Sequence, residues 1–136
     1  RIRLQLGYGD SMTNLAPSFD VSSELDRNEI HFTAKGLWDE QSLEAFREAM
    51  RMEMKPIVKR GEKMRFLADL RGFVPQERTV SAAIENLIDE SHKFGNERTA
   101  LVADSVLTIM QHRRLNKETN LQVFDNKVDA VTWLRT

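Results

Sequence analysis

The chain has no cysteine and no excess of charge of either sign. The missing thiols exclude disulfide bonds and thiolate metal sites. The 20 basic and 21 acidic residues give a formal net charge of −1, which offers no electrostatic footprint for nucleic acid. We therefore expect no nucleic-acid partner.

Long apolar runs and catalytic motifs are also missing. No run approaches the roughly 20 residues of a membrane span, and the opening stretch "RIRLQLGYGDSMTNLAP" contains no signal-peptide core. The motifs G-x-S-x-G, H-E-x-x-H and G-x-x-x-x-G-K-[ST] do not occur. Ser91 and His92 are neighbours on a predicted helix and point in different directions, so they cannot pair as nucleophile and base. We expect a cytoplasmic protein without enzymatic activity, with no catalytic residue, no metal and no cofactor.

The hydrophobic pattern predicts strands that alternate with helices. Two alternating runs, 19–25 and 29–36, flank a short polar connection and predict a β-hairpin. Later strands are predicted at 64–70, 99–103 and 121–124. The order β-β-α-β-α-β-α-β-α predicts an α/β domain with a largely parallel sheet and an antiparallel first strand.

Four helices follow from apolar residues three and four positions apart. Their expected N-caps are Asp39, Thr79, Asp104 or Ser105, and Asp125. Pro56 should end or kink the first helix, and Gly95 should end the second. The residues expected to face the sheet are Leu43, Phe46, Met50, Met54 and Ile57; Val80, Ile84, Leu87, Ile88 and Ser91; Val106, Ile109, Met110 and Arg113; and Val128, Val131 and Leu134.

A chain of 136 residues fits one domain. We expect this domain at 19–136, preceded by an N-terminal extension at 1–18, native or vector-derived, with Met12 as an alternative start. Within the extension, "RIRLQL" alternates with Ile2, Leu4 and Leu6 on one face, which is typical of a strand.

Ordered landmarks along the chain resemble the SpoIIAA-like family. They are "GLWDEQSLEAF", "FLADLRGF", "ALVADS" and "LQVFDNKVDAVTWL", the last matching at Val123, Phe124, Ala130, Trp133 and Leu134. The likeness covers residues 19–136. It implies a STAS-like superhelix of βα units and a small binding module, of a kind associated with membranes or lipophilic ligands.

The related anti-anti-sigma factors carry Asp-Ser-Ser-Gly after the central strand, with a serine that is phosphorylated. This chain has "LRGFVP", residues 70–75, at that point. We therefore expect at most weak regulation by phosphate, with Thr79 and Ser81 as the remaining acceptors at a helix start.

Asp69, Asp104 and Asp125 each follow a predicted core strand, at the edge of the sheet where ligands of open α/β folds bind. Three converging acids could hold Mg²⁺. Helix capping is the favoured role of Asp104 and Asp125. For Asp69 we favour an acceptor that pins the following loop over a metal ligand.

Apolar residues gather at the same edge and predict a small-molecule mouth. The candidate ligand-binding residues are Leu37, Trp38, Asp69, Phe73, Val74, Asp104 and Ser105. The alternative is that Trp38 and Phe73 fold back over the helices as core.

Four cations, Arg47, Arg51, Lys55 and Lys59, recur every four residues beside the apolar stripe of the first helix. Such a row can face an anionic membrane surface. The favoured alternative is a solvated flank with Glu44 to Arg47 and Glu48 to Arg51 pairs.

We interpret the chain as a module that binds a lipophilic or amphipathic small molecule, with the membrane surface as a second partner and location. The alternative is a regulatory protein–protein module that resembles an anti-sigma factor antagonist. A homodimer is left open as the assembly.

Overall fold

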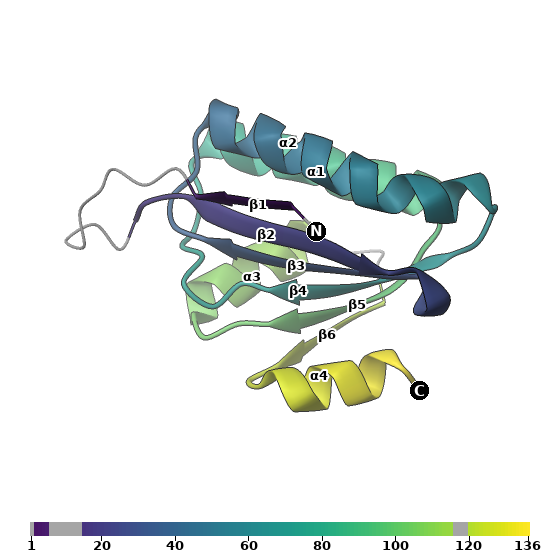
Figure 1. Cartoon of the computed structure of the whole chain (residues 1–136). Helices are drawn as coiled ribbons and strands as arrows, with labels where there is room; N and C mark the ends of the chain where they lie inside the picture. The colour runs from purple at the N-terminus through teal and green to yellow at the C-terminus, as the bar shows by residue number, and fades with distance from the viewer. Residues whose placement is uncertain (1, 6–14, 116–119) are drawn as a thin grey trace.

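The computed structural model describes residues 2–5, 15–115 and 120–136. One six-stranded sheet, in the order β1-β2-β3-β4-β5-β6, forms the centre of the molecule (Figure 1). The strands are β1 (Ile2–Gln5), β2 (Ser18–Glu24), β3 (Glu29–Lys35), β4 (Met64–Asp69), β5 (Asn96–Val102) and β6 (Leu121–Phe124). The strands predicted from the sequence are therefore all present.

Pairing follows the predicted topology. Strands β1 to β3 are antiparallel to their neighbours, whereas β3 to β6 are parallel, which confirms the mixed α/β class. The predicted hairpin turns through a short 3-10 segment, Leu25–Arg27, and Asn28 closes it with a φ of 56°. Asparagine tolerates this left-handed conformation better than most residues.

Helices cover both faces of the sheet (Figure 1). They are α1 (Glu40–Lys59), α2 (Arg78–Lys93), α3 (Val106–Leu115) and α4 (Lys127–Leu134). Helices α1 and α2 run side by side over one face, and α4 lies on the opposite face against β4 and β5. Among the described helices, none is long and apolar enough to cross a membrane.

Two apolar clusters result from this layering. The larger one, which includes Ile30, Ile57, Phe66 and Leu101, fills the space under α1 and α2. The smaller one joins Leu67, Ala100 and Val102 to Ala130 and Leu134 under α4. Strand β4 contributes alternate residues to both clusters, so the prediction that it is buried on both faces is confirmed.

Some predicted helix ends need correction. Helix α1 continues past Pro56 to Lys59, so Pro56 does not end it. Helix α2 begins one residue before Thr79, with Glu77 at the N-cap position. Asn126, not Asp125, caps α4, because its side chain accepts a hydrogen bond from the amide of Asp129 at 2.9 Å.

Other caps are as expected. Asp39 accepts the Ser42 amide at 2.8 Å and forms a reciprocal capping box with that serine. Ser105 caps α3 by accepting the Thr108 amide at 3.3 Å. Gly95, with a φ of 93°, follows Phe94, the C-cap residue of α2.

The predicted inward faces of α3 and α4 are partly wrong. Val106 and Met110 are 70% and 61% exposed, and Val128 is 75% exposed. Thr108 takes the buried position of α3 because its hydroxyl donates to the backbone oxygen of Phe73 at 2.6 Å. Ala130 and Leu134 form the buried face of α4.

The N-terminal segment Ile2–Gln5 belongs to the sheet. Ile2–Gln5 pair with β2, as the alternation of "RIRLQL" predicts. Leu6 and Met12 lie outside the described residues.

Candidate functional site

The loops after β3 and β4 are tied together at the strand ends. The amide of Gly36 donates to the Gly72 oxygen at 2.8 Å. The buried side chain of Gln76 reaches both loops: Oε1 accepts the Trp38 amide at 2.8 Å, and Nε2 donates to the oxygens of Gly36 and Val74. This edge of the sheet is therefore closed by hydrogen bonds.

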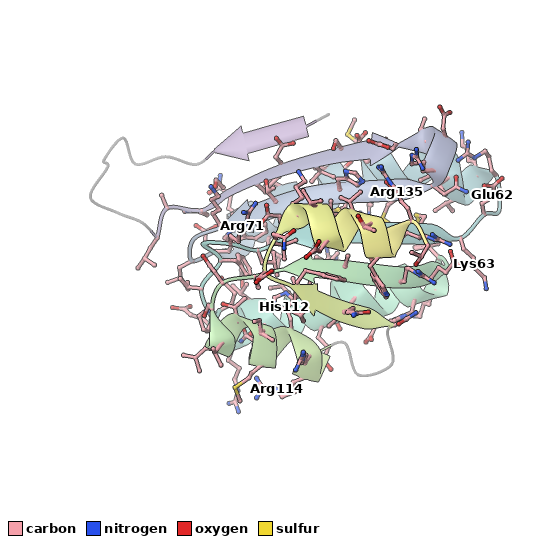
Figure 2. The ribbon with its side chains drawn as sticks, turned by 90° about the horizontal axis from the view of Figure 1, so that it is seen from below. Glu62, Lys63, Arg71, His112, Arg114 and Arg135 are labelled. Carbon is pink, nitrogen blue, oxygen red and sulfur yellow. The ribbon has the colours of Figure 1, made fainter. Side chains whose placement is uncertain are left out.

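Asp69 pins its own loop, as predicted. Its Oδ1 accepts the amide of Arg71 at 3.2 Å, and both carboxylate oxygens bind the Arg71 guanidinium, at 2.9 and 2.7 Å. Burial raises the pKa of Asp69, but the hydrogen bonds from Arg71 outweigh it and hold the pKa below its ordinary value. Figure 2 shows Arg71 at the end of the sheet opposite to Glu62 and Lys63.

Trp38 and Phe73 are core residues, 4% and 3% exposed. Their rings meet edge to face with centroids 5.5 Å apart, and Trp38 also contacts Phe46 at 5.1 Å. The structure thus has the second of the two predicted arrangements, in which these aromatic residues are part of the core.

Behind these aromatic residues lies an apolar cavity of about 120 Å³ between the sheet and helices α1 and α2. Its wall includes Trp38, Phe66 and Phe73. Helix α2 contributes Ile84, Leu87 and Ile88, all of them only half-buried. Val80 is the only fully buried residue of α2. The cavity exists because the apolar residues of α2 are not packed fully against the sheet.

A few polar groups line this cavity. Asn96 lies within hydrogen-bond distance of the Ser91 and Thr99 hydroxyls, at 3.4 and 3.3 Å. Its buried Oδ1 has no hydrogen-bond partner among the described residues. At another part of the wall, burial lowers the pKa of His112, whose ring lies 6.0 Å from that of Phe73.

The cavity adjoins an open groove of about 350 Å³ between α1 and α2. Four residues, Phe46, Met50, Leu87 and Ser91, line both spaces. The basic row of α1 lines the groove with all four of its members, Arg47, Arg51, Lys55 and Lys59. Glu44 lies 3.9 Å from the Nε of Arg47, as the predicted i, i+3 pairing requires.

The seven candidate ligand-binding residues do not line a single pocket. Trp38 and Phe73 line the apolar cavity under α1 and α2. Asp69 points to the other face, where it lines a polar pocket of about 200 Å³ with His31, Thr33 and Lys127. Leu37, Val74, Asp104 and Ser105 line none of these three spaces; Asp104 instead accepts the Gly72 amide at 3.4 Å. Across residues 2–5, 15–115 and 120–136, no group of three or more His, Asp or Glu side chains is placed to hold a metal ion.

Sequence reasoning missed Gln76, Asn96 and Arg71. Nothing in the sequence signals the first two, because each acts through contacts with segments distant in the chain or through its place on a cavity wall. Arg71 could have been found, because an arginine two residues after a strand-end aspartate is within reach of that carboxylate.

Comparisons with known proteins agree on the fold. A model of the SpoIIAA-like family matches residues 30–135. The structure resembles an uncharacterised protein from Shewanella loihica PV-4 with a SpoIIAA-like fold, at a TM-score of 0.67 and 16% identity over 94% of this chain and 99% of that one. It also resembles an anti-sigma factor antagonist from Mycobacterium paratuberculosis, at a TM-score of 0.59 and 13% identity over 89% of this chain and 96% of that one. No curated protein matches the chain.

Proposed function

The chain belongs to the SpoIIAA-like family, and from this premise we propose that it is a non-enzymatic module that binds a lipophilic small molecule in the space under α1 and α2. The observation that carries the proposal is the apolar cavity of about 120 Å³ that adjoins the groove between these helices. Apolar cavities on the order of 150 Å³ take up molecules such as benzene.

The energetics favour an occupant. A cavity costs on the order of 20 cal/mol per Å² of its surface, because the wall atoms lack contacts on one side. A hydrocarbon chain in this space would restore those contacts and complete the burial of Ile84, Leu87 and Ile88. Each methylene transferred from water contributes up to about 0.8 kcal/mol.

We expect a fatty alcohol such as decanol to change the fluorescence of Trp38 and to raise the melting temperature. Trp38 lines the cavity, whereas Trp133 lies on the other face of the sheet, so Trp38→Phe should remove most of the change. The measurement is tryptophan emission during titration, together with thermal unfolding at each concentration. At a ligand concentration of 100 Kd the stabilisation should be about 2.7 kcal/mol.

A variant whose cavity is filled by a larger side chain should not bind decanol. Ser91→Leu adds a branched side chain to the wall shared by cavity and groove, and we expect it to abolish the decanol response without lowering stability. Asn86→Leu, on the exposed side of the same helix, is the matched control and should respond as the wild type does. An unchanged response of Ser91→Leu, or no response of the wild type to any apolar probe, would contradict the proposal.

A regulatory contact with another protein is the second candidate. It is favoured by an exposed apolar patch on α3, formed by Val106, Leu107 and Met110, which are 70%, 64% and 61% exposed. The fold similarity to an anti-sigma factor antagonist supports the same reading. Exposed patches of this kind mark interaction sites in soluble domains.

Native mass spectrometry of the protein purified gently from its own host distinguishes the two functions. A bound mass of a few hundred daltons that is absent from Ser91→Leu supports the ligand. A stoichiometric protein partner that is lost in Leu107→Glu, with the small mass retained, supports the regulatory contact. A partner that survives Leu107→Glu counts against the α3 patch.

A further inference from the structure

The groove between α1 and α2 has one charged wall and one apolar floor. The wall is the basic row, whose members lie one helical turn apart on α1. The floor includes Met50, Met54 and Val58 from the same helix and Leu87 and Phe94 from the α2 side. A chain leaving the cavity through this groove would pass directly along the four cations.

The charges of the groove do not cancel. Four cationic side chains line it, against one carboxylate, that of Glu90. Glu44, the ion-pair partner of Arg47, has a side chain that is 69% exposed and is not part of the lining. The groove is therefore an electropositive concave surface, which attracts anions more strongly than a flat surface of equal charge.

Arg47 adds an independent observation. Its side chain is only 22% exposed, and its Nε is buried without a hydrogen-bond partner among the described residues. Its ion-pair partner, Oε2 of Glu44, is 3.9 Å away, which is too far for a hydrogen bond. A buried donor without an acceptor costs about 1–3 kcal/mol, more when the group is charged. An anionic ligand oxygen in the groove would supply the missing acceptor.

We propose that the ligand is a single-chain anionic amphiphile, with its hydrocarbon chain in the cavity and its carboxylate or phosphate head on the basic row. This inference rests on the proposed function and names the ligand class for that site. It also assigns a role to Arg47, Arg51, Lys55 and Lys59: they bind the head of a free amphiphile in a groove. A bilayer surface is flat and would contact convex side chains, whereas this apolar surface lies recessed between two helices.

The test compares three probes with the same chain and different heads: decanoate, decanol and decyltrimethylammonium. Decanoate should bind at least tenfold more tightly than decanol, and decyltrimethylammonium more weakly than both. The double variant Arg47→Gln/Arg51→Gln should lose at least tenfold in decanoate affinity and leave decanol affinity unchanged. The matched control, Arg113→Gln/Arg114→Gln on α3, removes the same charge outside the groove and should change neither.

The outcomes separate this inference from the proposed function. Equal affinity for decanoate and decanol, or equal loss of both in the double variant, overturns the anionic head and leaves the apolar site standing. Failure of all three probes overturns both proposals. The last experiment of the test is co-sedimentation of the protein with phosphatidylglycerol vesicles. Binding to vesicles that depends on Arg47 and Arg51, without binding of monomeric decanoate, would assign the row to a membrane surface and overturn the inference.

Discussion

Replacing Gly36 by alanine is expected to lower the free energy of unfolding by about 3 kcal/mol or more. Gly36 has a φ of +85°, where a side chain is strained. A Cβ there would lie 2.3 Å from the backbone oxygen of Ala16 and 2.7 Å from that of Leu15, so the preceding segment would have to move. Chemical denaturation followed by circular dichroism measures the loss.

Gly61→Ala is the matched control. Gly61 has a similar φ of +70°, but nothing lies within 4 Å of the added Cβ. It should cost about 1 kcal/mol, the strain of a left-handed alanine alone. The difference between the two variants then isolates the steric clash at Gly36. If both variants lose the same free energy of unfolding, the segment before β2 moves away from the added Cβ at no cost. The edge of the sheet at the ends of β3 and β4 is then not rigid.

The Gly36 result bears on where a ligand could enter. The amide of Gly36 and its carbonyl oxygen both take part in the hydrogen bonds that join the loops after β3 and β4. If that edge is rigid, the cavity behind Trp38 and Phe73 is reached from the groove between α1 and α2, where the wall is open. If that edge is not rigid, a ligand would instead enter the cavity at the ends of the strands.

The strands were predictable because their signal is local. Alternation in β3 puts Ile30 and Phe32 on the α1 face and His31 and Thr33 on the other, whatever the rest of the chain does. Continuous apolar residues in β4 likewise require two covered faces. The order of the elements then leaves few topologies, so the mixed sheet followed.

The orientation of α3 was not predictable in the same way. Its ten residues contain apolar side chains on all sides, and a count of hydrophobic positions favours Val106 and Met110 as inward. The helix instead turns Thr108 inward, because the hydroxyl finds the carbonyl of Phe73. A satisfied polar contact between segments 35 residues apart leaves no periodic signal.

The candidate site shows the same limit of local patterns. The basic row of α1 is visible in the sequence, and its spacing is sufficient to place the four cations along one flank. That this flank forms the wall of a groove depends on α2 lying beside it, and the cavity depends on how far α2 stands from the sheet. Both are properties of packing, not of either helix alone.

Breaking the ion pair between Glu29 and Arg135 is the second change with a large expected effect. Glu29 is 1% exposed, and its carboxylate binds the Arg135 guanidinium through two contacts of 3.0 Å. Arg135 also reaches Glu24 at 3.0 Å, so it ties the end of α4 to the β2–β3 hairpin. Figure 2 shows Arg135 at the end of the sheet away from Arg71.

Arg135→Met should lower the free energy of unfolding by about 2–3 kcal/mol, because it leaves a buried carboxylate without its cation. The partial exposure of Arg135, 30% of its side chain, keeps the loss below that of a fully buried pair. Arg27→Met is the control, because Arg27 pairs with Glu24 in solvent at 3.7 Å and should cost less than about 0.5 kcal/mol. In a Glu29→Gln background, Arg135→Met should lower the free energy of unfolding by less than it does in the wild type. The reason is that residue 29 then carries no charge that could be left unpaired.

The pH dependence gives the sharper result. Burial raises the pKa of Glu29, but the hydrogen bonds from Arg135 and His31 outweigh it and hold the pKa below its ordinary value of 4.5. The folded wild type therefore binds fewer protons than the unfolded chain just below pH 4.5, and the contribution of Glu29 is present above that pH and lost as the pH falls through the folded-state pKa. In Arg135→Met the guanidinium no longer counteracts the effect of burial, so the pKa of Glu29 in the folded protein should rise above 4.5. The free energy of unfolding of this variant should then fall as the pH rises from 4.5 through that higher pKa. Unfolding curves measured from pH 3.5 to 7 should thus diverge with increasing pH. A gap between wild type and variant that stays constant over this range would show that Arg135 stabilises α4 by packing and not through the buried charge of Glu29.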